Sequence, residues 1–216
     1  MDNTATRNSR LILLSIVGLP VTMVLAATWL WFFVSRGDID LVDLLGTSNH
    51  GVLLNPPTQL NDFSYQNQFG AQALFAGSEP QWTLLVPVPS QCDDICLSTL
   101  YLTRQIHLGL GKEFGRIRRV YVSPERVNLD SPLPAVLSDS MAEGVTQIGE
   151  YLEGYHKAMP LLHMDAQDYQ TTFGQSAAGM WYVVDPAGWM MMSYESTVHY
   201  KDVTSDLKFL LKNSAD

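Results

Sequence analysis

The two cysteines of this 216-residue chain, Cys92 and Cys96, are the side chains best suited to chemistry. An apolar segment, residues 83–86, precedes them, and a segment with helical spacing of apolar side chains, residues 97–110, follows. Cysteines four positions apart can face one another across the first turn of a helix. A helix N-terminus also lowers the pKa of a thiol, which makes thiolate available as nucleophile or metal ligand. Two thiolates suit Cu(I) or a reversible disulfide.

Two acidic residues lie between the cysteines. The charges of Asp93 and Asp94 raise the pKa of nearby thiols and disfavour attack on a disulfide, but beside a bound cation they are tolerable. They could instead only cap the helix and complement its dipole. A structural disulfide is a further alternative, although a bridge closing so short a loop adds little stability. We therefore expect Cys92 and Cys96 to be both the catalytic residues and the metal ligands.

Other candidate ligands are less well placed. His163 is considered as a further metal ligand, and the remaining histidines are interpreted as surface or core residues: His50, His107, His156 and His199. Thioethers also bind Cu(I), and Met180 lies close to the loop before residues 181–184. Residues 190–192 are all methionine and are expected to fill the core, with Met190 and Met192 on one strand face and Met191 on the other.

Basic side chains gather between residues 112 and 119. Lys112, Arg116, Arg118 and Arg119 are expected to form a solvated helix end and strand edge. The alternative is contact with acidic lipid or an acidic partner. The sequence contains no nucleophile–base triad, zinc signature or phosphate-binding loop.

The segments around the cysteines predict how they are held. Residues 83–86 and 116–122 are expected to be strands on either side of the helix over residues 97–110. Strand, helix and strand at this spacing form a βαβ unit, in which the two strands are parallel. The cysteines therefore lie where the first strand passes into the helix.

The second half of the chain completes the pattern. Helices are expected from Ser140 or Thr146 to about residue 156, over residues 165–173, and from Thr204 or Ser205 to residue 212. Strands over residues 181–184 and 189–194 flank an Asp-Pro-Ala-Gly turn and form a hairpin. The order βαβ, helix, ββα is that of an α/β thioredoxin-like domain, a central mixed sheet flanked by helices.

An anchor is expected before this domain. Residues 11–34 carry no charge, and their 24 positions would span roughly 36 Å as a helix, enough to cross a bilayer. We expect an uncleaved transmembrane anchor, with a cleaved signal peptide as the alternative. Arg7 and Arg10 precede the span and predict a cytoplasmic N-terminus, which puts the remainder in the periplasm of a bacterial cell.

The expected organisation has four parts: a cytoplasmic tail at 1–10, the anchor at 11–34, a tether and irregular extension at 35–80, and the thioredoxin-like domain at 81–216. The extension could alternatively include a short strand pair packed on the domain. Three of the 13 basic and one of the 22 acidic residues lie in the first 36 positions, so the remainder carries a net charge of −11. Such a domain repels nucleic acid, which excludes that class of partner. Outside the cytoplasm a disulfide can persist.

Several spaced motifs occur together in the chain. They are Asn49-His50-Gly51 with Pro56-Pro57, Cys92-Asp93-Asp94-Ile95-Cys96, Leu100-Tyr101-Leu102 with Arg104-Gln105, and Val184-Asp185-Pro186 with Gly188 and Met190-Met191. On these motifs, over roughly residues 49–214, the chain resembles the Sco/SenC family of cytochrome oxidase assembly proteins. The resemblance implies a membrane-anchored assembly factor in the bacterial inner membrane, with a thioredoxin-like periplasmic domain. Its implied partners are a cytochrome c oxidase subunit, subunit II, or other assembly factors.

The resemblance also implies the chemistry. Cys92 and Cys96 match the CxxxC pair with which the family carries Cu(I), and some members reduce disulfides. The family's third copper ligand is a histidine in the loop before residues 181–184, but here residues 175–179 read Gln-Ser-Ala-Ala-Gly. The implied function is therefore Cu(I) delivery or thiol–disulfide reduction at the copper site, with the third ligand open. The alternative is a non-catalytic docking module with a structural or vestigial cysteine pair.

Overall fold

The computed structural model describes residues 3–35, 49–75, 80–89, 91–134, 144–174 and 179–214. The chain divides into two units, residues 1–48 and Asn49–Asp216. The first unit contains the long helix α1 (Asn3–Ser35), so most of the expected tail is helical. Within α1, Ser15–Phe33 is long and apolar enough to cross a membrane. Its 19 residues correspond to about 28 Å of helix, close to the thickness of a bilayer core.

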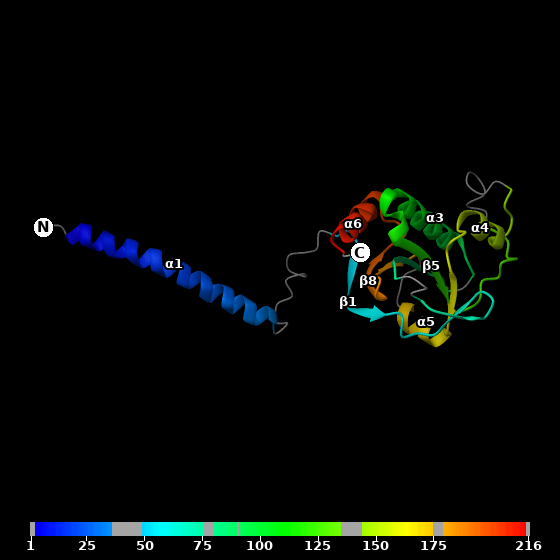
Figure 1. Cartoon of the computed structure of the whole chain (residues 1–216), viewed down its shortest axis with the longest axis horizontal. Helices are drawn as coiled ribbons and strands as arrows, with labels where there is room; N and C mark the ends of the chain where they lie inside the picture. Colours follow the sequence, from blue (N-terminus) through cyan, green and yellow to red (C-terminus); the bar gives the residue numbers. More distant parts are fainter. Residues whose placement is uncertain are drawn as a thin grey trace. The chain divides into compact units, whose positions relative to one another are not determined.

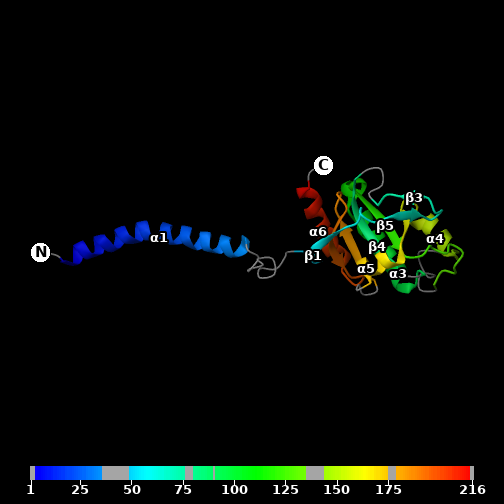
Figure 2. The same cartoon turned by 90° about the horizontal axis from the view of Figure 1, so that it is seen from below.

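Figures 1 and 2 show the second unit. Its described residues form one mixed sheet of eight strands in the order β1-β8-β7-β4-β5-β6-β2-β3. The strands are β1 (Val52–Gln59), β2 (Tyr65–Asn67), β3 (Gln72–Ala73), β4 (Trp82–Pro87), β5 (Ile117–Ser123), β6 (Leu161–Met164), β7 (Trp181–Val184) and β8 (Trp189–Tyr194). The helices are α3 (Asp94–Gly109), the 3-10 helix η1 (Gly111–Arg116), α4 (Ile148–Tyr155), α5 (Ala166–Phe173) and α6 (Tyr200–Asn213).

The expected βαβ unit is β4-α3-β5. β4 and β5 pair in parallel from Trp82 opposite Ile117 to Pro87 opposite Val122. β4 lies between β5 and β7 and is buried on both faces, which explains its nearly continuous apolar sequence. The expected hairpin is confirmed as β7 and β8, which pair antiparallel across the turn.

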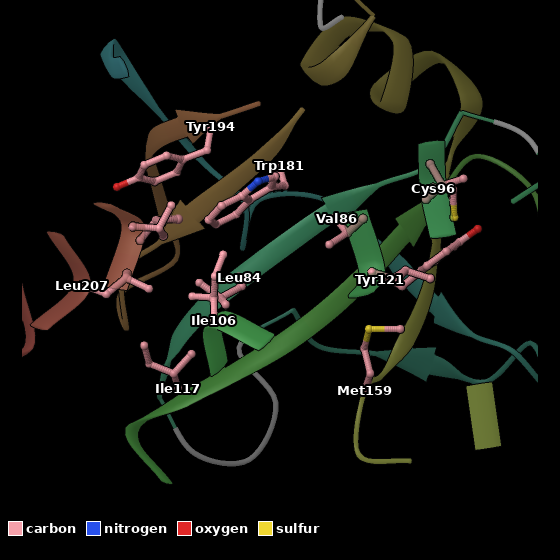
Figure 3. Close-up of a cluster of buried hydrophobic side chains, with 14 of the residues drawn as sticks. Leu84, Val86, Cys96, Ile106, Ile117, Tyr121, Met159, Trp181, Tyr194 and Leu207 are labelled. Carbon is pink, nitrogen blue, oxygen red and sulfur yellow. The ribbon is translucent and has the colours of Figure 1, made fainter. Parts of the chain in front are cut away.

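Two hydrophobic clusters lie on opposite faces of the sheet. Alternate residues of β4, Leu84 and Val86, enter the cluster that α3, α4 and α6 cover, part of which Figure 3 shows. Leu85 enters the second cluster, to which α5 contributes Tyr169 and Phe173. The sheet is therefore the middle layer of three. The β4–α3 junction lies at the end of a central strand of this sheet.

Residues 49–75 belong to this unit, so the domain starts well before the expected boundary at residue 81. β1 pairs with β8, and β2 pairs with β6 and β3. Most side chains of β1 and β3 are exposed or half-buried, so these edge strands lack the apolar alternation by which a strand is predicted. β6, four residues between Pro160 and α5, was also not expected. The part of the expected tether over residues 36–48 lies outside the described residues.

The placement of the methionine run differs from the expectation. Val183 pairs with Met192 and Val184 pairs with Met190, so Met191 is the extra residue of a bulge. As a result Met192 packs in the first cluster and Met190 in the second. The prediction of a core role is confirmed for both, whereas the prediction that they share one face is wrong.

The last helix begins earlier than expected. The N-cap of α6 is His199, whose ring accepts a hydrogen bond from the backbone N–H of Lys201 at 3.3 Å. Histidine is not among the preferred capping residues, so the serine and threonine further on were the stronger sequence signals. Thr204 instead lies inside α6, where its hydroxyl donates to the carbonyl of Tyr200.

Candidate functional site

The cysteines lie at the start of α3, directly after β4 and its two prolines. Asp93 is the N-cap, and its carboxylate accepts a hydrogen bond from the backbone N–H of Cys96 at 2.9 Å. Asp94, the first residue of the helix, places a negative charge at the positive end of the helix dipole. Asp93 therefore does cap the helix, and the same cap fixes the backbone that carries Cys96.

Cys92 and Cys96 are joined by a disulfide, with their Cα atoms 5.2 Å apart. They differ in exposure: Cys96 is 6% exposed and packs in the first hydrophobic cluster, as Figure 3 shows, whereas Cys92 is only half-buried. A partner molecule can therefore reach the sulfur of Cys92 more readily. In a thiol exchange reaction this arrangement assigns Cys92 to attack and Cys96 to resolution.

A cleft of about 120 Å³ opens beside Cys92, and Tyr121 of β5 lines it together with Glu125 and Arg126. Burial, and then the charge of Asp93, raises the pKa of Tyr121, so the hydroxyl stays protonated and can donate to a thiolate. Sequence analysis did not identify this residue, because a tyrosine in a buried strand carries no separate signal.

A second, smaller cleft of about 50 Å³ lies beside Cys96. Met180 and Gly179 line it, together with the prolines that end β4. Gly179 has φ of +83°, and a Cβ there would lie 2.9 Å from a methyl carbon of Ile95. The loop that ends at Gly179 therefore reaches the residue next to Cys96, although residues 175–178 of that loop lie outside the described part of the chain.

The histidines do not join the cysteines. His163 is on β6, which β5 separates from β4, and its ring Nδ1 is buried without a hydrogen-bond partner among the residues that the structure describes. His107 lies near the end of α3, where it stacks on Phe114 with ring centroids 3.9 Å apart. Across the described ranges no cluster of three or more His, Cys, Asp or Glu side chains could hold a metal ion.

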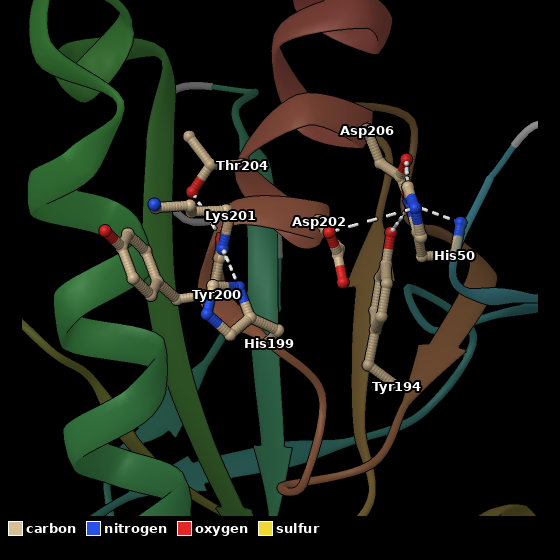
Figure 4. Close-up of polar contacts among 8 residues, drawn as sticks. All are labelled: His50, Tyr194, His199, Tyr200, Lys201, Asp202, Thr204 and Asp206. Atoms are coloured by element: carbon tan, nitrogen blue, oxygen red, sulfur yellow. Dashed lines mark hydrogen bonds and ion pairs between the residues drawn. The ribbon is translucent and has the colours of Figure 1, made fainter.

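His50 belongs to a separate network on α6, shown in Figure 4. Asp206 is buried and accepts hydrogen bonds from the Tyr194 hydroxyl at 2.8 Å and from the His50 backbone N–H at 2.7 Å. The His50 ring Nδ1 lies 3.1 Å from the other carboxylate oxygen of Asp206. The hydrogen bond to Asp206 raises the pKa of His50. This network ties the first residues of the domain to its last helix.

The basic group divides into exposed and buried members. Lys112 is exposed, and Arg116 pairs with Glu113 at 3.1 Å and donates to the carbonyl of Leu211 at the end of α6. Arg118 donates to the hydroxyl of Thr83 and to the carbonyl of Phe75. Arg119 is only 8% exposed, so the expectation of a solvated strand edge is wrong for this residue.

The sequence and the fold were compared with those of known proteins. The family described as transmembrane-like, thioredoxin-like, C-terminal domain matches residues 82–214. No curated protein matches the chain by sequence. Sco proteins are among the solved structures with a similar fold, which confirms the expected thioredoxin-like fold of the domain and its likeness in fold to the Sco family.

Three of these structures illustrate the likeness. Apo Sco1 from Thermus thermophilus is 19% identical, with a TM-score of 0.53 over 75% of this chain and 96% of its own. Yeast Sco1 is 18% identical, with a TM-score of 0.51 over 71% and 94% of the two chains. ScoI from Arabidopsis thaliana, solved with copper bound, is 14% identical, with a TM-score of 0.50 over 70% and 97%.

Proposed function

The chain belongs to the family of transmembrane-like, thioredoxin-like C-terminal domains, and from this premise we propose that it is a membrane-anchored thiol–disulfide reductant in cytochrome c oxidase assembly. The observation that carries the proposal is the Cys92–Cys96 disulfide at the start of α3, with one sulfur accessible and the other buried. The oxidase as partner rests on the motifs shared with the Sco/SenC family. The bacterial inner membrane and a periplasmic domain are part of the proposal, and they are supported by the apolar span Ser15–Phe33 and by Arg7 and Arg10 before it.

The reduced pair would act in two exchange steps. The Cys92 thiolate attacks one sulfur of a disulfide between the copper-site cysteines of subunit II, and the other sulfur leaves as a thiolate that takes up a proton. The Cys96 thiolate then attacks the Cys92 sulfur of the mixed disulfide and releases the second subunit thiol. The subunit gains two electrons and the Cys92–Cys96 disulfide forms, so an external thiol reductant must regenerate the pair.

Trapping the intermediate tests this order. The chain with Cys96→Ser, mixed with the oxidised soluble domain of subunit II, should accumulate a mixed disulfide through Cys92. The Cys92→Ser chain should accumulate far less, because its remaining thiol is buried. Non-reducing electrophoresis with mass spectrometry measures both products. No adduct with either variant, together with normal oxidase assembly in cells that carry both substitutions, would support the docking module instead.

Cu(I) delivery is a second candidate, and the position of Met180 favours it. When the disulfide is reduced, the Cys96 thiol lines the cleft that it shares with Met180, and the Cys92 thiol is its former disulfide partner. Thiolates and thioethers are the ligands that Cu(I) prefers, so this methionine could take the place of the family histidine. In this version Cu(I) is the cargo that the protein passes to subunit II.

A competition titration of the reduced chain with Cu(I) and a chelator tests the second candidate. If Met180 is a ligand, Met180→Leu should weaken binding by about tenfold, equivalent to about 1.4 kcal/mol. Met159→Leu is the matched control, because Met159 is buried away from the cysteine clefts. Equal Cu(I) binding by both variants would exclude Met180 as a ligand. If the reduced chain does not bind Cu(I) stoichiometrically, thiol–disulfide reduction remains the better-supported function.

A further inference from the structure

Cys96 is the buried sulfur of the pair, and its surroundings do not favour an anion. The side chain is 6% exposed and packs in the first hydrophobic cluster. Reduction of the disulfide by an outside thiol nevertheless places negative charge there, because attack on the accessible Cys92 sulfur makes Cys96 the leaving group. A charge in apolar surroundings is costly unless a hydrogen bond compensates it. The Cys96 sulfur therefore needs a hydrogen-bond donor at this step.

The donors next to this sulfur along the chain already have acceptors. The N–H of Cys96 donates to the Asp93 carboxylate at 2.9 Å, and the N–H of Leu97 donates to the Asp93 carbonyl at 3.0 Å. The hydroxyl of Thr99, further along α3, donates to the carbonyl of Ile95. The negative charge of Asp93 also opposes a second anion beside it. A donor for the Cys96 sulfur therefore has to come from another element.

The hydroxyl of Tyr121 on β5 is placed to act as this donor. Figure 3 shows the hydroxyl pointing toward the sulfur of Cys96, and both side chains belong to the first hydrophobic cluster. Tyr121 also lines the cleft beside Cys92, so it adjoins both ends of the disulfide. The residue is only 1% exposed, so packing holds its ring in place. A donor that is fixed before the reaction stabilises a developing charge without having to reorganise.

We propose that the Tyr121 hydroxyl donates a hydrogen bond to the Cys96 thiolate as it forms, which makes Tyr121 a catalytic residue of the exchange reaction. One thiolate of an outside dithiol bonds to the Cys92 sulfur, the Cys92–Cys96 bond breaks, and its electron pair passes to Cys96, which takes a proton from water. The second thiol of the reductant then displaces Cys92 and closes the reductant's own disulfide. The inference rests on the proposed function only in that the pair cycles between dithiol and disulfide.

Reduction of the oxidised full chain by dithiothreitol, in nanodiscs of zwitterionic lipid, tests the proposal. Samples are quenched with a maleimide, and mass spectrometry measures the reduced fraction against time. Tyr121→Phe keeps the ring, removes only the hydroxyl, and should slow reduction about tenfold. Tyr169→Phe is the matched control and should leave the rate unchanged, because Tyr169 is also buried but packs in the second cluster, on the other face of the sheet. Equal rates in Tyr121→Phe and the unsubstituted chain would overturn the proposal.

A second comparison separates the hydrogen bond from a general disturbance of the site. In a chain with Cys96→Ser, the remaining Cys92 thiolate attacks dithiobis(nitrobenzoate), a small disulfide whose released thiolate is coloured. Adding Tyr121→Phe to this chain should not change that rate, because Cys96 takes no part in it. Equal slowing in the two assays would show that the hydroxyl acts on Cys92 or only supports the fold, and would overturn the assignment to Cys96.

The two assays do not depend on the biological partner. If the chain forms no adduct with subunit II, the proposed function fails, but the effect of Tyr121→Phe on reduction by dithiothreitol should still be seen. If the adduct forms and Tyr121→Phe has no effect on reduction, the proposed function stands and the role of Tyr121 is excluded.

Discussion

The side chain of Asp93 has two opposing effects on the cysteine pair. Its carboxylate caps α3 by accepting from the Cys96 N–H, which stabilises the helix start that carries the site. The same negative charge lies beside the sulfur atoms and disfavours a thiolate. The cap and the charge can be separated, because asparagine also accepts a hydrogen bond at an N-cap but carries no charge.

Substitutions of Asp93 should separate these effects. In the reduced chain, Asp93→Asn should keep the melting temperature and lower the pKa of the attacking thiol, because only the charge is lost. Asp93→Ala should also remove the cap and lower the free energy of unfolding by about 1 kcal/mol. Ultraviolet absorbance of the thiolate against pH measures the first effect and thermal unfolding the second. An unchanged thiol titration in Asp93→Asn would show that the charge does not act on the cysteines.

The pair of His50 and Asp206 makes stability depend on pH. The folded pKa of His50 is raised above 6.5, chiefly by the hydrogen bond to Asp206. The protonated ring is therefore favoured in the folded chain, and the pair stabilises the fold fully below pH 6.5. That contribution disappears as the pH rises through the folded pKa of His50.

His50→Gln should consequently lower the melting temperature most below pH 6.5, and the difference from the unsubstituted chain should shrink as the pH rises. Asp202→Asn is the control, since this carboxylate lies 3.9 Å from the His50 ring and both groups are well exposed, so its effect should be smaller. The effect of His156 on stability has the opposite pH dependence, because its pKa in the folded chain is lowered to about 3. His156 is present in both chains, so its contribution cancels when their melting temperatures are compared. A difference that grows with pH would contradict the assignment.

At the level of elements, the sequence predicted those with a strong apolar pattern or clear turn chemistry. The strand β4, the helix α3 and the β7–β8 hairpin have bounds close to the expected ones. The positions of the edge strands β1 and β3 could not be predicted, because pairing defines them, of β1 with the distant β8 and of β3 with β2, and not their own side chains. The Met191 bulge was missed because period-two alternation of side chains cannot show an extra residue in one strand.

The placement of the cysteine pair at the start of a helix could be predicted, because an apolar strand precedes the pair and a helical pattern follows it. The side chains that line the clefts beside the pair come from separate elements. Tyr121 reaches the Cys92 cleft from β5, and Met180 reaches the Cys96 cleft from the segment before β7. Only the folded sheet brings these side chains to the start of α3, so no local pattern could have placed Tyr121 there.

The docking of β1 depends on a glycine. A Cβ at Gly51, just before β1, would lie 2.6 Å from Met192 Sδ and from Tyr194 Cζ on β8. Gly51→Ala should therefore force β1 away from β8 and lower the free energy of unfolding by about 1–3 kcal/mol. Gly154→Ala in α4 is the contrasting variant, because no atom lies within 4 Å of its added methyl group, and helix propensity should raise stability by about 0.5–1 kcal/mol. Chemical denaturation measures both, and an unchanged Gly51→Ala chain would show that β1 is not tightly docked.

At the scale of the whole molecule, the two units have surfaces that suit different environments, lipid and water. Large apolar side chains of α1, such as Val24, Leu25 and Trp31, are 63–69% exposed within their unit, an arrangement that suits lipid and not water. The residues after position 36 carry a net charge of −11 and enclose two hydrophobic clusters, which suits an aqueous compartment. We therefore expect that α1 stays attached and that the membrane-bound protein keeps the full mass of 24.1 kDa.

Thiol labelling in cells tests the orientation of the molecule. After reduction, a maleimide that cannot cross the inner membrane should label Cys92 from outside, because Cys92 is the more exposed cysteine and the domain is expected in the periplasm. A chain with Asn8→Cys and both native cysteines changed to serine is the control, and it should react only after the inner membrane is permeabilised. The reverse labelling pattern would place the dithiol in the reducing cytoplasm. There a reversible disulfide would not persist, and a copper site in the periplasm would be out of its reach.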